Sequence, residues 1–243
     1  MFWMIYTFYV DSLLFIIKNR IVVFPFFFYV VGYFLLGQFF EGFLNFLFLI
    51  VYYCLVETYA TVVVYKEEML FDSSESAWQI INRFSGKTLL LTVTEGFALA
   101  FFLVVYIVLF YDNGFEFERP FFGFIEFFFG TAYLLSLRHL LYHNPILVMD
   151  SMKAGVKDLY KNFPFYLLLV LFGKVLAGYP SILFPVSWAI VPFLPIAELS
   201  RNIAIGDGIN WISIIINPIL FAITSIAFTY AFLTMKRKEK HAS

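Results

Sequence analysis

Cysteine and charged residues are scarce in this 243-residue sequence. The single cysteine, Cys54, excludes a disulfide framework and a multi-cysteine metal site. Charged residues make up 14% of the chain, against roughly 25% in a typical soluble domain, so a soluble fold is not expected. The net charge of −1 leaves no basic excess of the kind that nucleic-acid binding requires, and we expect no nucleic-acid partner.

Common catalytic motifs are also missing from the sequence. There is no phosphate-binding glycine loop, no nucleophile elbow and no HExxH zinc motif. We therefore expect no cofactor and favour a protein that is not an enzyme, although the sequence alone leaves enzymatic activity open.

Hydrophobic residues account for 62% of the chain and aromatic residues for 23%. They gather in six long apolar stretches, each with about the 20 residues that an α-helix needs to cross a ~30 Å hydrocarbon core. The predicted spans are residues 21–40, 43–65, 88–111, 120–142, 163–182 and 210–235. The sequence thus predicts an all-α, polytopic membrane protein with a single integral membrane domain over residues 1–243.

Lys and Arg residues alternate between the connections of the predicted spans. Thirteen of the 16 lie before the first span, after the second or fourth span, or in the basic tail at 236–243. Cytoplasmic loops are enriched in Lys and Arg. This distribution therefore predicts a multi-pass protein of the cell membrane with both termini in the cytoplasm.

Two apolar segments do not fit a simple span. Residues 1–20 are rich in aromatic side chains and are divided by Asp11, and we expect an interfacial helix at the headgroup level. Residues 181–199 contain three prolines that would interrupt one continuous helix. A seventh span there would move the basic tail to the outer side, so we favour a re-entrant segment on that side.

A shift of 78 residues aligns residues 69–91 with residues 147–169 and places Asp72 on Asp150. Each segment predicts an Asp-Ser N-cap, a short amphipathic helix, an Asn beside a basic residue, and then a membrane helix. Residues 11–28 form a weaker third copy. The alternative is that such signals recur by chance before any span.

The predicted repeat units extend over residues 69–111 and 147–182. Both units run from the cytoplasm outward, so the repeat would be parallel, about an axis normal to the membrane, as in some transporters.

The layout of short cytoplasmic amphipathic helices that lead into membrane helices, with pairs such as Asp72-Ser73 and Asn82-Arg83, resembles a known group of proteins. It is similar to poorly characterised six-span prokaryotic integral membrane families related to the glycerophosphodiester phosphodiesterase membrane domain. The resemblance covers most of the chain and implies an accessory or transport-related membrane role. It implies no active-site residues, because this chain holds no phosphodiesterase domain.

Charged residues inside the predicted spans are candidates for function, because each costs roughly +2.5–3.5 kcal/mol at the centre of a membrane helix. The 78-residue shift places Glu95 one position from Lys174, which predicts an acid–base pair at similar depth. Glu57 lies on the preceding span and could join this pair. The set is either an ion pair that fixes helix register or part of a solute or proton path.

A second candidate set is Arg138, His139 and His143, at the cytoplasmic end of the fourth predicted span. The two histidines lie four residues apart and face the same way on a helix, but two ligands are too few for a metal unless Asp150 approaches. We predict no metal site. Contact with lipid phosphate is favoured, because the guanidinium group binds phosphate in a fork.

Two function classes follow from these features. The first is a transport component or accessory subunit of a membrane complex, whose partners would be other membrane subunits or a separate ATPase. The second is a membrane-embedded lipid-handling protein or enzyme at the cytoplasmic interface. Membrane lipids are expected partners in both classes.

Overall fold

The computed structural model describes residues 1–29, 32, 43–110, 118–143, 146–183, 204–205, 208–209 and 211–242. Nearly all of these residues are helical, which confirms the predicted all-α class. The helices are α1 (Phe2–Lys18), η1 (Arg20–Val22), α3 (Phe43–Glu67), α4 (Ala77–Phe110), α5 (Glu118–Tyr142), α6 (Val148–Lys161), α7 (Phe163–Leu183) and α9 (Trp211–Ala242). Residues 23–29 continue from η1 as a helix, and β1 (Ala204–Ile205) pairs with β2 (Gly208–Ile209) in an antiparallel hairpin.

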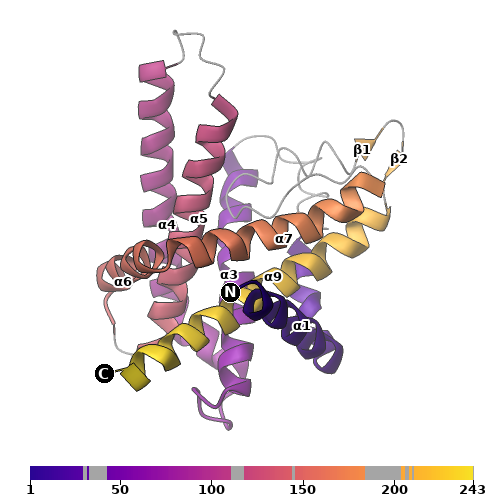
Figure 1. The fold of residues 1–243 in the computed structure, drawn as a ribbon, viewed down its shortest axis with the longest axis vertical. Helices are drawn as coiled ribbons and strands as arrows, with labels where there is room; N and C mark the ends of the chain where they lie inside the picture. The colour runs from indigo at the N-terminus through magenta and orange to yellow at the C-terminus, as the bar shows by residue number, and fades with distance from the viewer. Residues whose placement is uncertain are drawn as a thin grey trace.

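The helices form a bundle in which some axes cross (Figure 1). α3, α4 and α5 run along the long axis of the molecule, whereas α7 and α9 lie across them. α1 packs against α9, and α6 packs closely against α5. Large buried side chains fill the spaces between these helices, among them Phe26, Tyr65, Tyr133, Tyr166, Phe228 and Phe232.

Within the described residues, one helix is long and apolar enough to cross a membrane. It is Pro218–His241, with a mean hydropathy of 1.7 in its most apolar stretch. A second candidate is the pair Phe2–Lys18 and Arg20–Tyr29, which is bent by 105°. The six-span architecture therefore stays a prediction, and several of its spans include residues outside the described part of the chain. The predicted re-entrant segment 181–199 also lies outside it, apart from the three residues that end α7.

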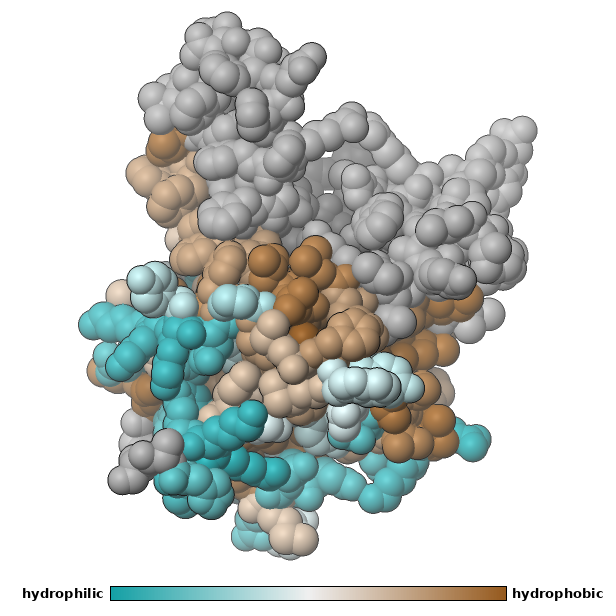
Figure 2. Space-filling view, in the orientation of Figure 1, coloured by the Kyte–Doolittle hydropathy of each residue, from teal (hydrophilic) through white to brown (hydrophobic). Residues whose placement is uncertain are grey.

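Apolar side chains are exposed along several helices. On α4 eight of them are 40–73% exposed: Trp78, Leu89, Leu90, Val93, Phe97, Phe101, Phe102 and Val104. Hydrophilic residues gather instead over α6 and the C-terminal end of α9 (Figure 2). Contiguous apolar surface of this extent is unusual on a soluble monomer and is typical of contact with lipid or with another protein.

The predicted break before a membrane helix is present in two of the three similar units. α1 ends at Lys18 and α6 ends at Lys161, and the asparagine that follows each helix, Asn19 or Asn162, has a backbone φ of −120°. In the unit at 69–91, by contrast, α4 runs through Asn82 without interruption. Pro164 explains the break in one unit, because proline lacks an N–H and its ring clashes with the preceding helical turn. No proline stands two residues after Asn82, and none stands there after Asn19, so proline accounts only for the break after α6.

The predicted Asp-Ser N-caps are wrong. Asp11 lies within α1 and Asp150 lies in the first turn of α6 after Leu147, whose side chain makes no capping hydrogen bond. α4 is capped by Ser76 instead: its hydroxyl accepts from the backbone N–H of Gln79, at 3.2 Å. The Gln79 side chain accepts from the backbone N–H of Ser76, at 2.8 Å, which completes a capping box.

Candidate functional site

A buried ion pair joins three helices in the centre of the bundle. Nη2 of Arg138 on α5 lies 3.1 Å from Oε2 of Glu57 on α3, and their side chains are 0% and 1% exposed. Ser225 on α9 donates its hydroxyl to the same Glu57 oxygen at 2.8 Å. Sequence reasoning singled out Glu57 and Arg138 but placed them in separate sets.

Arg138 is held by more than its acid partner. Nη1 donates to the Leu134 carbonyl at 3.0 Å, Nη2 to the Ser225 carbonyl at 3.0 Å, and Nε to Thr229 at 3.3 Å. Its guanidinium carbon also lies 5.3 Å from the centre of the Phe228 ring. A buried pair with this many partners is costly to break, because either charge alone would be left without compensation.

Of the other two predicted intramembrane charges, the structure describes the side chain of Glu95 alone. Glu95 on α4 is 4% exposed, and within the described residues its Oε1 has no hydrogen-bond partner. The Lys174 side chain lies outside the described part, so the predicted Glu95–Lys174 pair stays a prediction. Glu57, which was expected to join that pair, faces Arg138 instead.

His139 belongs to a second, more polar cluster next to the ion pair. Its Nε2 lies 2.7 Å from Oδ2 of Asp158 on α6, which is also 2.8 Å from Nζ of Lys236 on α9. Lys236 in turn contacts Glu239 at 2.8 Å, and Glu239 contacts Lys161 of α6 at 2.6 Å. The cluster thus ties the ends of α5, α6 and α9 together. The acid beside His139 is Asp158, not the Asp150 considered from the sequence.

Burial and neighbouring charges shift the pKa values of two groups in and beside this cluster. Burial opposes ionisation of Asp158, but hydrogen bonds from His139 and Lys236 outweigh it and leave the pKa of this carboxyl below its ordinary value. His143 is exposed and stacks on His139, with ring centroids 5.8 Å apart. Partial burial, with His139 and Lys236 nearby, lowers the pKa of His143. Within the described residues, no group of three His, Cys, Asp or Glu is placed to hold a metal ion.

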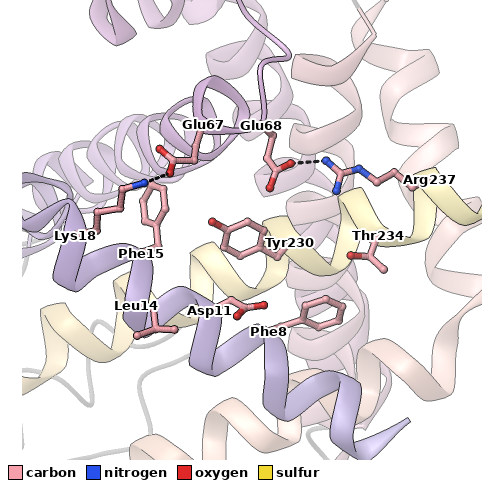
Figure 3. Close-up of a pocket in the computed structure, with 10 residues that line it drawn as sticks. All are labelled: Phe8, Asp11, Leu14, Phe15, Lys18, Glu67, Glu68, Tyr230, Thr234 and Arg237. Atoms are coloured by element: carbon pink, nitrogen blue, oxygen red, sulfur yellow. Dashed lines mark hydrogen bonds and ion pairs between the residues drawn. The ribbon is translucent and has the colours of Figure 1, made fainter.

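A pocket of about 400 Å³ lies between α1, the end of α3 and the last turns of α9 (Figure 3). Two ion pairs border it: Lys18 with Glu67 at 2.7 Å, and Arg237 with Glu68. Asp11 extends its carboxylate into the pocket. In the described parts of the chain, no hydrogen bond or ion pair involves the side chain of Asp11. The pocket therefore offers both signs of charge and one free carboxylate.

Sequence reasoning missed this pocket, although two signals pointed toward it. Glu67 and Glu68 form an acidic pair directly after the basic Lys66, and Arg237 belongs to the basic tail. What the sequence does not reveal is that α1 packs against α9, which brings Asp11 beside them.

The turn after α3 fixes the two pocket glutamates. Leu70 N–H donates to the Tyr65 carbonyl at 2.8 Å, and Met69 N–H donates to the Lys66 carbonyl at 3.1 Å. This pair of bonds is a Schellman motif, which requires a left-handed residue after the helix end. Met69 takes that conformation, with a φ of 57°.

No family model, curated protein or solved structure matches this chain. A function must therefore be argued from the residues and their geometry.

Proposed function

We propose that this chain is an integral membrane protein that serves as a transport component or accessory subunit of a membrane complex. The observation that carries the proposal is the mixed-charge pocket bordered by Lys18, Glu67, Glu68 and Arg237. It lies near the polar end of a helical bundle whose sides expose apolar residues (Figure 2). Such a pocket suits a charged solute or a charged segment of a partner protein.

The exposed apolar face of α4 supports the membrane part of the proposal. Its residues recur at intervals of three and four, so they form a stripe along one side of the helix. The apolar helix Pro218–His241 is also long enough to span a bilayer.

The buried ion pair favours an accessory subunit over a mid-membrane solute path. Glu57 and Arg138 satisfy one another, and Ser225 and Thr229 occupy further hydrogen-bonding positions. Charges held in this way fix the relative positions of α3, α5 and α9 and leave little capacity to bind a passing ion. The exposed charges of the pocket remain available for recognition.

The lipid-handling alternative receives less support from its predicted residues. Arg138 and His139 are 0% and 3% exposed and are bonded to protein groups, whereas contact with a lipid phosphate requires an accessible cation. Of the three residues in that set, His143 alone is exposed.

Purification of the full chain from its native membrane in mild detergent, followed by mass spectrometry, tests the proposal. We expect a stoichiometric membrane subunit, an ATPase or a charged solute to be retained. Asp11→Asn and Arg237→Gln should reduce its retention at least several-fold, because each removes a pocket charge. Asp150→Asn is the matched control, since it removes an exposed acid outside the pocket.

The proposal would be overturned by a protein that carries no partner and no solute. Equal retention by the wild type and both pocket variants would also overturn the assignment of the pocket.

A further inference from the structure

A second cavity has a different chemical character from the charged pocket. Its volume is about 360 Å³, and it lies between residues 21–28, α3 and the first turns of α4. Its lining is apolar and aromatic: Ile21, Phe24, Pro25, Phe28, Tyr52, Leu55, Val56, Tyr59, Trp78 and Ile81. We call it the apolar groove.

Eight of the ten lining residues come from one face each of two neighbouring helical segments. The residues from 21–28 and those from α3 follow the same spacing of i, i+3, i+4 and i+7, which is one side of a helix. Faces of this kind normally interdigitate. Here they leave a gap that runs for seven residues, or about 10 Å at 1.5 Å per residue.

The length of the groove suits one leaflet of a membrane. Half of a ~30 Å hydrocarbon core is about 15 Å, so most of one acyl chain within a leaflet would fit beside the groove walls. At one end, the rings of Tyr29 and Tyr52 stack with centroids 5.9 Å apart. The other end, at Ile21, Tyr59 and Trp78, is the mouth.

A cationic residue adjoins this mouth in the chain. Arg20 immediately precedes Ile21, and it is exposed. In the described part of the chain, no hydrogen bond or ion pair involves its side chain. The chain bends by 105° between α1 and the helical segment that Arg20 begins, so Arg20 sits at the corner where the groove starts. Trp78 is 70% exposed beside the same mouth, as is common for tryptophan at the headgroup level.

We propose that the apolar groove binds one acyl chain of an anionic phospholipid, whose phosphate is bound by Arg20. The apolar walls suit the acyl chain of the lipid, and the free guanidinium group of Arg20 suits its negatively charged phosphate. A partner's membrane helix would also cover apolar walls, but it would not need an unpaired cation at the mouth. This lipid site rests on the proposed membrane location of the chain.

Fluorescence quenching by a brominated lipid tests the site. The full chain, with Trp78 as its sole tryptophan after Trp→Phe substitution at positions 3, 188 and 211, is reconstituted in phosphatidylcholine vesicles. Phosphatidylglycerol brominated on its acyl chains is then added in increasing fractions. One Arg near an anionic phosphate gives about a fivefold preference for that lipid. We therefore expect half-maximal quenching at a mole fraction of brominated lipid about one-fifth of the value for a lipid that mixes at random around the protein.

Two variants and one control locate the effect. Arg20→Gln should abolish the fivefold preference, and Leu55→Phe, which fills the groove, should weaken quenching while the thermal transition persists. Lys157→Gln removes an exposed cation on α6 and should leave the preference unchanged.

The lipid site is overturned if brominated phosphatidylcholine quenches equally well, or if Arg20→Gln and Lys157→Gln reduce the preference equally. Extraction with alkaline carbonate separates this failure from that of the proposed function. A chain that stays in the membrane without lipid preference defeats only the lipid site, whereas a chain released by carbonate defeats both.

Discussion

Met69 holds a backbone conformation that glycine adopts at lower cost. Its φ of 57° lies in the left-handed region, where a side chain costs about 1–2 kcal/mol, and its side chain is 91% exposed. Met69→Gly should therefore raise the free energy of unfolding by about 0.5–1 kcal/mol, because part of this relief is offset by the flexibility of glycine in the unfolded chain. Thermal unfolding in detergent measures this change in stability. Met69→Ala keeps the strain and should show no gain.

The Glu57–Arg138 pair makes opposite predictions for single and double substitution. Arg138→Met should lower stability by about 3–5 kcal/mol, because it leaves a buried carboxylate without its cation. Adding Glu57→Met should recover most of that loss, since two apolar side chains need no compensation. Denaturation of both variants, at equal detergent concentration, measures the recovery. A double variant as unstable as the single one would contradict the importance of charge compensation.

At the scale of elements, the contact between α5 and α6 depends on the absence of a side chain at Gly155. A Cβ at this position would lie 2.7 Å from the backbone nitrogen of Ser136 and 3.0 Å from the carbonyl oxygen of Ala132. Gly155→Ala should destabilise the fold by about 1–3 kcal/mol, because backbone atoms of α5 must move.

Gly86→Ala is the matched control for this contact. A Cβ there meets nothing within 4 Å, and the position lies inside α4. Helix propensity alone should then stabilise this variant by about 0.5–1 kcal/mol. Equal unfolding midpoints for the two alanine variants would show that α6 does not pack on α5 as described.

The sequence predicted helical structure from long apolar runs, and it predicted a break before the helix at 163–182 from a basic and polar signal. It did not predict that α4 runs through Asn82. Pro164 marks the break after α6, but α1 ends before Asn19 with no proline two residues later, so neither Asn nor a downstream proline decides the outcome alone. The true cap at Ser76 was overlooked in favour of Asp72, although Ser76 and Gln79 have the spacing of a capping box.

At the scale of the whole molecule, the polar cluster predicts acid sensitivity. The pKa of Asp158 lies below its ordinary value of 3.8, and that of Glu239, hydrogen-bonded to Lys161 and Lys236, lies below 4.5. Their contribution to stability is therefore complete above these ordinary values and is lost as the pH falls through the lowered ones. Thermal transitions measured from about pH 6 to pH 3 should fall less steeply for Asp158→Asn than for the wild type. Asp150→Asn is the control. A fall in the thermal transition between these pH values that is as steep in Asp158→Asn as in the wild type would contradict the prediction.

The candidate sites were partly accessible from the sequence. Costly charges in apolar runs pointed to Glu57, and a polar group at a helix end pointed to Arg138 and His139. Their partners were not predictable, because Ser225, Asp158 and Lys236 approach through tertiary packing of α6 and α9 on α5. The same limit explains the assignment of a lipid contact to Arg138: an arginine near the end of a predicted span has the same sequence signature whether it faces lipid or protein.

The packing of α1 on α9 has a consequence for synthesis of the chain. Phe15 of α1 packs edge-to-face on Tyr230 of α9, with ring centroids 6.3 Å apart, and Nζ of Lys238 lies 3.6 Å from the sulfur of Met4, so the first helix meets these partners late. At 5–20 residues per second, the ribosome needs on the order of 10–50 s to make the intervening chain. Throughout that interval the aromatic face of α1 has no α9 to cover it. A bilayer surface that holds α1 during this interval would protect the nascent chain from aggregation.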